Sequence, residues 1–447
     1  MSKKNPRNCR RYGRTSYAKK GRYIALLLSL FAIVAASVGL ANAPSDAQQS
    51  TANAARNAAL VAATNEVLQE TSQLRQLPIL RPVQASAQSR EEIQRMIVSS
   101  MDQETTPAQL HAADVVLKKL GLAPADFQLR TLMIRLLTEQ VAGYYDPKRQ
   151  QFHLADWIDV DGQKPVMAHE LTHALQDQHF NLRRFDHWPK GDSDAELAAH
   201  ALIEGDATLL MTMYITSNPL RALSFLKSLS GTEVATEELN KAPRAVRETL
   251  LFPYEEGLKW TQTVYRYGGW PNVSQAFSQL PQSTEQILHP EKYFVNEQPV
   301  QVTLPNLSKL LRPAVWRRLD SDVNGEWASY LILDQFLKSP AESRKAAAGW
   351  GGDHYEVFEN RRGQVAYVSL SSWDTEKDAR EFFDAYIART RLRYPDATFA
   401  GFNNSSSART DEGDVLIRLR GKQVLAVEGL PDSRTIKAVA NAILRGE

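Results

Sequence analysis

Residues 165–180, PVMAHELTHALQDQHF, combine three histidines with two acids in one stretch of helical apolar periodicity. His169 and His173 are four residues apart, so on a helix they share one face. Two imidazoles at that spacing can bind one zinc ion, and H-E-x-x-H is a known zinc signature. Glu170 can face a zinc-bound water without being a ligand, which makes it the candidate general base. The alternative interpretation is a charged, solvated helix face.

A third ligand is expected on a second helix, predicted over 193–214 by its apolar spacing. This segment is mostly apolar or small, so its ionisable residues Glu204 and His200 need partners. We assign Glu204 as the third ligand and keep His200 as the alternative ligand. A third possibility is that His200 and Glu204 form a buried pair that binds no metal. Thr208, one turn further on, could support a ligand. Gly205 lowers helix stability relative to alanine and indicates close packing.

The N-terminal 43 residues predict an export signal. They hold nine basic residues and no acid, followed by an apolar run at 24–40 and the cleavage-type tripeptide Ala41-Asn42-Ala43. We expect a cleaved signal peptide and an exported chain, periplasmic or extracellular; an uncleaved membrane anchor is the alternative. The only cysteine, Cys9, precedes the apolar run, so a metal site must use histidines and carboxylates.

Charge argues against a nucleic-acid partner. Subtracting the nine N-terminal basic residues from the total of 53 leaves 44, against 51 acidic residues. Such a balance gives no basic footprint for nucleic acid.

H-E-x-x-H at 169–173 followed by E-G-x-A at 204–207 resembles the gluzincin zinc peptidases, which include the collagenases and the aminopeptidase branch. A further segment, FPYEEGLKW at 252–260, is similar to the P-Y-E-x-G helix of the aminopeptidase branch. The resemblance covers roughly 140–280. It implies one zinc ion on His169, His173 and Glu204, Glu170 as general base, and a peptide or protein substrate. It also implies that Tyr254 hydrogen-bonds the oxyanion; a core tyrosine is the alternative.

The blocks STEQILHPEKY and GWGGD also resemble a group of uncharacterised exported bacterial proteins. In the first block, His289 and Tyr293 could support a zinc ligand or contact the substrate. Alternatively, both residues could serve only to stabilise the fold. Asp177 is interpreted as a helix-surface acid. A segment near 152–154 is expected to form an edge strand that pairs with an extended peptide.

The overall fold is predicted to be α+β. A low-complexity linker over 44–90 precedes a mainly helical, zincin-like domain over 91–340 with a small edge-strand sheet. A small α+β domain of unknown role follows over 345–447, after a protease-sensitive junction near 338–352. The expected function is an exported zinc metallopeptidase. Its rivals are a catalytically silent zincin-like binding protein and a zinc hydrolase of a non-peptide amide or ester.

Overall fold

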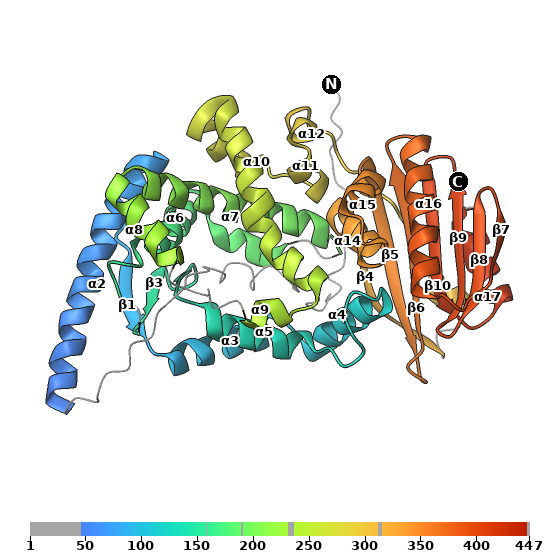
Figure 1. Ribbon diagram of the computed structural model, residues 1–447, viewed down its shortest axis with the longest axis horizontal. Helices are drawn as coiled ribbons and strands as arrows, with labels where there is room; N and C mark the ends of the chain where they lie inside the picture. The colour runs from blue at the N-terminus through green and yellow to red at the C-terminus, as the bar shows by residue number, and fades with distance from the viewer. Residues whose placement is uncertain (1–45, 158, 189–190, 231–236, 312–314, 445–447) are drawn as a thin grey trace, which may run out of the picture.

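The computed structural model describes residues 46–157, 159–188, 191–230, 237–311 and 315–444 (Figure 1). The predicted signal peptide or anchor at 1–43 lies outside these ranges. Within them, no helix combines the length and the apolar character that crossing a bilayer requires. The predicted α+β class is confirmed: a helical N-terminal part with a three-stranded sheet is followed by a seven-stranded antiparallel sheet.

The N-terminal part is built mainly from helices. Its helices are α2 (Asp46–Arg75), α3 (Arg90–Glu104), α4 (Pro107–Lys119), α5 (Leu129–Gln140), α6 (Lys164–Phe180), α7 (Ser193–Thr216), α8 (Pro219–Ser230), α9 (Glu237–Lys241), α10 (Arg244–Ala276), α11 (Thr284–Leu288) and α12 (Pro290–Phe294). Its strands are β1 (Gln84–Gln88), β2 (Gly143–Asp146) and β3 (Gln151–Ala155).

The three-stranded sheet has the order β1-β3-β2. β1 runs parallel to β3, and β2 runs antiparallel to it. The predicted peptide-pairing edge at 152–154 is therefore wrong, because β3 is the central strand and both of its sides are occupied. The strand that borders α6 is β2, whose Tyr145 N–H turns away from β3 and donates to Glu170 on that helix.

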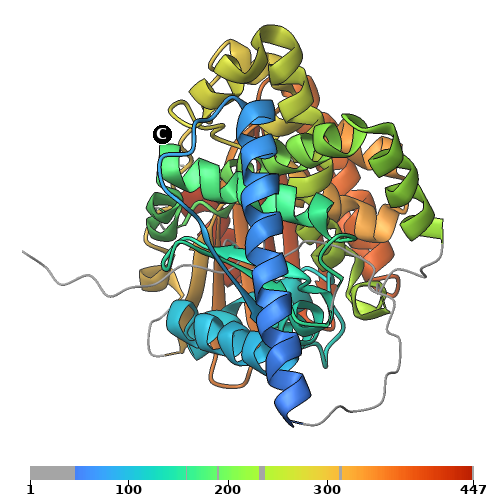
Figure 2. The same cartoon turned by 90° about the vertical axis from the view of Figure 1, so that its left-hand side faces the viewer.

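The predicted linker over 44–90 is also wrong for its described part. α2 crosses the end of the helical part as a long helix (Figure 2), and β1 belongs to the sheet. Leu60 and Val67 of α2 are buried with Met167 and Leu171 of α6 in one apolar cluster. The segment lacks aromatic residues, but aliphatic residues at helical spacing are sufficient once α6 offers an apolar face.

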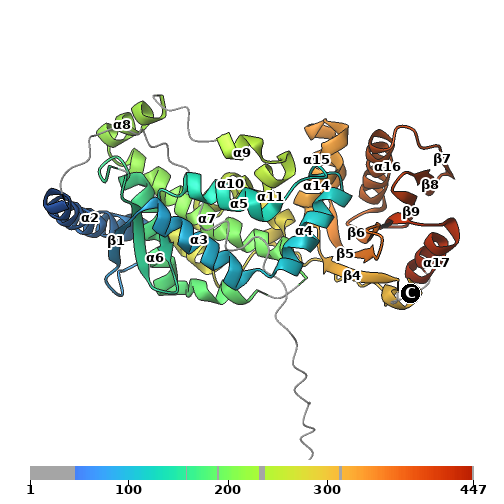
Figure 3. The same cartoon turned by 90° about the horizontal axis from the view of Figure 1, so that it is seen from below.

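The C-terminal sheet has the order β4-β5-β6-β10-β9-β8-β7. Its strands are β4 (Trp316–Asp322), β5 (Trp350–Asn360), β6 (Val365–Trp373), β7 (Phe399–Phe402), β8 (Ser405–Thr410), β9 (Gly413–Arg420) and β10 (Gln423–Leu430). The accompanying helices are α13 (Leu307–Leu310), α14 (Gly325–Leu337), α15 (Pro340–Ala347), α16 (Glu376–Arg393) and α17 (Ser433–Leu444). α14 and α15 lie between the sheet and the N-terminal helices (Figure 3).

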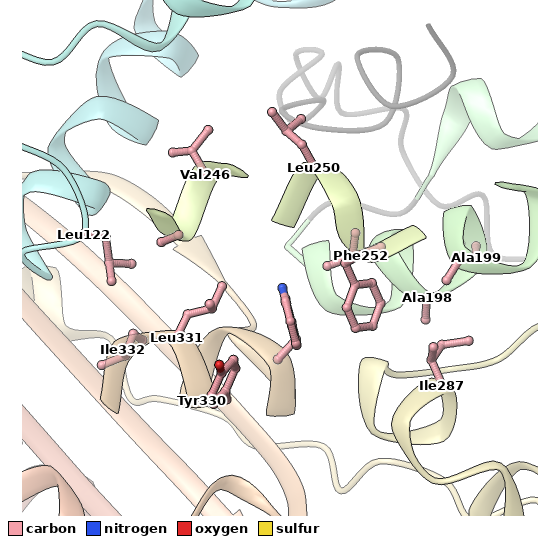
Figure 4. Packing of buried hydrophobic residues seen from close by; sticks show 14 of the residues in the cluster. Leu122, Ala198, Ala199, Val246, Leu250, Phe252, Ile287, Tyr330, Leu331 and Ile332 are labelled. Atoms are coloured by element: carbon pink, nitrogen blue, oxygen red, sulfur yellow. The ribbon is translucent and has the colours of Figure 1, made fainter. Parts of the chain in front are cut away.

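The predicted division between 340 and 345 is misplaced. β4, which the prediction assigned to the helical domain, pairs with β5 as the first strand of the C-terminal sheet. The predicted protease-sensitive junction at 338–352 covers α15 and the start of β5, where Ser343, Ala347 and Trp350 are buried, and its sensitivity to protease stays a prediction. The two parts also share a core: Val246 and Leu250 of α10 and Leu331 of α14 belong to the same apolar cluster (Figure 4).

The packing of α2 gives a direct test of the corrected boundary. Leu60 is 1% exposed and its neighbour Val61 is 45% exposed. Leu60→Ala should lower the free energy of unfolding by about 2–5 kcal/mol, because it removes buried methyl groups and leaves a cavity. Val61→Ala, the matched control, should change it by less than about 0.5 kcal/mol. Urea denaturation measures both; equal, negligible effects would restore the linker interpretation.

Candidate metal centre

Helices α6 and α7 bring the three predicted ligands together. His169 Nε2 lies 3.1 Å from Glu204 Oε2, and His173 Nε2 lies 3.4 Å from the same oxygen. The two Nε2 atoms are 3.1 Å apart. All three side chains are buried, and Glu204 Oε1 has no hydrogen-bond partner among the described residues. Two imidazole nitrogens and one carboxylate with an unpaired oxygen fit a zinc ion, which takes this donor set in three-ligand hydrolytic sites.

Glycines set the distance between α7 and α10. A Cβ on Gly205 would lie 2.2 Å from the Gly257 carbonyl oxygen, and a Cβ on Gly257 would lie 2.3 Å from the Ala201 carbonyl oxygen. The two helices therefore touch backbone to backbone, as the mid-helix glycine indicated. Since Gly205 follows Glu204 directly and Gly257 is one turn after Tyr254, this contact brings the glutamate and the tyrosine to the same region.

Tyr254 lies beside the cluster. Its ring stacks on His169 with centroids 6.1 Å apart and an interplanar angle of 25°. The predicted tyrosine is thus next to a predicted ligand, on a third helix.

Glu170 is buried next to the ligands but is not one of the three converging groups. Its Oε2 accepts a hydrogen bond of 2.9 Å from the backbone N–H of Tyr145 in β2. Burial raises the pKa of Glu170 to about 8, while the charge of His173 and this N–H act in the opposite direction. A carboxyl group with a raised pKa suits proton transfer near neutral pH.

A second contact fixes α6 against β2. The Tyr145 hydroxyl donates to Asp177 Oδ2 at 3.0 Å, and Arg81 pairs with the same oxygen at 3.0 Å. Asp177 is buried, so its interpretation as a surface acid is wrong. It holds the C-terminal half of the H-E-x-x-H helix to the strand that contacts Glu170.

The three candidate ligands stabilise one another's charges. Burial alone would raise the pKa of Glu204, but the neighbouring histidines, His173 first, lower it to about 2. Burial opposes charge on His173, but the Glu204 carboxylate raises its pKa to about 9. Among the described residues, His173 and His169 therefore stabilise the negative charge of the buried Glu204 carboxylate.

Three residues outside the predicted set support His173. Its Nδ1 lies 2.9 Å from Gln176 Oε1. Gln176 Nε2 donates to Ile203 O at 3.0 Å and to Asp206 Oδ2 at 2.9 Å, and Asp206 pairs with Arg75 of α2. Sequence reasoning missed Arg75, Gln176 and Asp206. Asp206 could have been found as another charge in an apolar helix, but nothing in the sequence links it to Arg75.

A cleft of about 490 Å³ adjoins the centre. His173 and His200 lie in its wall, with residues of α3 and of the β2–β3 turn opposite them. Burial lowers the pKa of His200 to about 4, and its Nδ1 has no partner in the described part of the chain. His200 is therefore neutral and beside the site, but Glu204 is the residue that converges with the two histidines. The buried Thr208 hydroxyl also makes no bond to a described residue, so it does not support Glu204.

His289 and Tyr293 lie elsewhere. His289 Nε2 is 2.9 Å from Glu326 of α14, and the Tyr293 hydroxyl donates to the Gln279 carbonyl at 2.9 Å. The Tyr293 ring packs edge-on against Trp260, with centroids 4.9 Å apart. Both residues thus have structural contacts, and neither is among the described residues that line the cleft.

A second acidic cluster already has its cation. Glu285, Glu297 and Asp374 converge, but Lys292 Nζ lies 2.7 Å from each glutamate and 2.5 Å from the aspartate. The ammonium group occupies the place that a metal ion would need. Among the described residues, the histidine–glutamate cluster is therefore the stronger metal candidate.

Comparison with known proteins matches one family model, the Domain of unknown function (DUF8575), over residues 312–440. The match runs from the segment before β4 into α17, so it covers the C-terminal sheet and leaves out His169, His173 and Glu204. No curated protein and no solved structure matches the chain.

Zinc content tests the ligand assignment. His173→Ala and Glu204→Gln should each remove most of the bound zinc from the purified protein, because each deletes one of three ligands. His200→Ala, one turn from Glu204 on the same helix, should keep full occupancy and is the control. Metal analysis after dialysis gives the readout. Zinc that survives in Glu204→Gln but is lost in His200→Ala would reverse the assignment.

Proposed function

We propose that this chain is a zinc-dependent metallopeptidase. The observation that carries the proposal is the convergence of His169, His173 and Glu204 with Glu170 placed beside them and outside the ligand set. A purely structural metal site would close its coordination with protein ligands, whereas three protein ligands leave a position for water or substrate. A bound zinc ion would supply Lewis acidity towards water and towards the scissile carbonyl.

Glu170 acts first as general base. Its Oε2 is held by the Tyr145 N–H, which orients the carboxylate and leaves Oε1 to take the proton of the attacking water. The same carboxyl group then delivers that proton to the leaving amine. Its raised pKa supports both steps, because a group that titrates near neutral pH exchanges protons in either direction.

Tyr254 stabilises the developing oxyanion. Its ring stacks on His169, one of the proposed zinc ligands, and this proximity supports the role. A phenolic O–H is a suitable donor to an alkoxide, and such a donor acts mainly in the transition state.

The shape around the centre supports an extended peptide as substrate. The cleft beside His173 is large enough for several side chains, and Tyr144 and Phe185 contribute aromatic surface to it. The adjoining strand, β2, has one side unpaired in the sheet order. The proposed export of the protein rests on the sequence of residues 1–43 alone.

Replacement of the proposed general base distinguishes an effect on catalysis from an effect on zinc binding or folding. Glu170→Gln should lower kcat by about a hundred- to ten-thousand-fold or more while zinc content and folding stay unchanged, because an amide cannot accept the proton. Glu356→Gln, a buried glutamate of β5, is the control. The readout is turnover of a quenched peptide library with and without chelator. Near-normal turnover by Glu170→Gln would refute the mechanism.

The same assay separates the rival functions. A zinc-loaded wild type that cleaves no peptide but hydrolyses an amide or ester reporter would be a non-peptide hydrolase. A zinc-loaded wild type without any hydrolysis would be a binding protein.

Tyr254→Phe tests the oxyanion role. It should lower kcat by about a hundred- to a thousand-fold with little change in KM, since the lost hydrogen bond forms in the transition state. Tyr265→Phe on the same helix, whose ring packs on Trp270, is the matched control and should stay within about twofold. An effect of Tyr254→Phe on KM alone would assign the hydroxyl to substrate binding instead.

A further inference from the structure

We infer that Arg75, at the end of α2, is a positioning residue for the metal centre: through Asp206 and Gln176 it fixes His173 with its proton on Nδ1 and its Nε2 free to bind the ion. The inference rests on the proposed function for the identity of the ion. The relay itself is defined by hydrogen bonds among four buried side chains.

The relay begins with a buried ion pair. Arg75 Nε donates to Asp206 Oδ1 at 2.6 Å and its Nη2 donates to Oδ2 at 3.2 Å, with both side chains 0% exposed. The remaining face of the guanidinium is also used: Nη1 donates to Ser274 Oγ at 3.1 Å, and the group lies 4.4 Å from the centre of the Trp270 ring. A carboxylate held by two guanidinium donors is only an acceptor towards its other neighbours.

The acceptors around Gln176 then determine how its amide is turned. One side of the amide faces Ile203 O at 3.0 Å and Asp206 Oδ2 at 2.9 Å. Neither atom can donate, so the NH₂ group must lie on that side. The carbonyl oxygen, Oε1, must therefore face His173.

This orientation sets the tautomer of His173. Its Nδ1 is 2.9 Å from Gln176 Oε1, and a carbonyl oxygen can only accept, so the proton belongs on Nδ1. In the neutral ring, the form that binds a metal, the lone pair is then on Nε2, the atom that lies 3.1 Å from His169 Nε2 and 3.4 Å from Glu204 Oε2. Partners behind a metal ligand commonly change metal affinity about ten- to a hundredfold.

The alternative is that Arg75–Asp206 contributes only to stability, as buried ion pairs elsewhere do. The chain contains a matched pair for this comparison. Arg389 and Glu428 in the C-terminal part are also 0% exposed and 2.9 Å apart, and no ligand of the metal centre contacts them. If Arg75–Asp206 only stabilises the fold, equivalent substitutions in Arg75–Asp206 and in Arg389–Glu428 should have the same effect on zinc affinity.

The experiment compares zinc affinity of the full-length protein by competition with a chromogenic chelator. Arg75→Lys and Gln176→Met should each weaken zinc binding about ten- to a hundredfold, because His173 loses its fixed orientation. Arg389→Lys should shift the urea midpoint without changing zinc affinity. Wild-type affinity in both Arg75→Lys and Gln176→Met would overturn the inference, and so would an equal loss in Arg389→Lys.

A second readout does not need the metal. Gln176→Met should remove the acceptor of the His173 Nδ1 proton, so the neutral ring should lose its fixed Nδ1 tautomer. The ¹⁵N shifts of the His173 ring, recorded in metal-free protein at a pH where the ring is neutral, report this change. Nε2 protonation already in the wild type would overturn the relay. If the wild type shows the Nδ1 tautomer but binds no zinc, the relay stands and the proposed function fails.

Discussion

A carboxylate removed from water requires donors or positive charge within a few ångströms, and Glu204 is completely buried at the centre of the helical core. In the described structure its only close polar neighbours are the Nε2 atoms of His169 and His173, and its Oε1 has no partner. A divalent cation between these three groups would compensate the carboxylate and use the free oxygen. The packing of α6 against α7 puts both imidazoles within reach of this carboxylate.

Two further contacts position the elements around the candidate site. The glycine contact between α7 and α10 brings Tyr254 towards the ligands, and any side chain at Gly205 or Gly257 would collide with the opposite backbone. The Arg75–Asp206 pair ties α2 to α7, so a helix far from the H-E-x-x-H motif in sequence takes part in its support. α2 thus supports the candidate metal centre as well as the core.

The local part of this site was predictable from the sequence. The positions of His169, Glu170 and His173 follow from helix periodicity, and Glu204 was distinguished by its charge within an apolar helix. Tyr254 was identified through its resemblance to a known motif, and the structure places it against His169. Long-range partners were not predictable, because Arg75 reaches Asp206 over a sequence separation of 131 residues. The linker and the domain boundary were misplaced for a related reason: composition does not reveal that α2 finds an apolar face on α6, or that β4 pairs with β5.

The central claim is that His169, His173 and Glu204 hold one zinc ion, and anomalous diffraction from crystals of the purified protein at the zinc absorption edge tests it most directly. The account predicts one strong peak about 2.0–2.2 Å from both Nε2 atoms and from a Glu204 carboxylate oxygen. The claim would be contradicted if crystals grown with added zinc showed no peak between these residues. It would also be contradicted by a peak found only at another cluster, such as Glu285, Glu297 and Asp374.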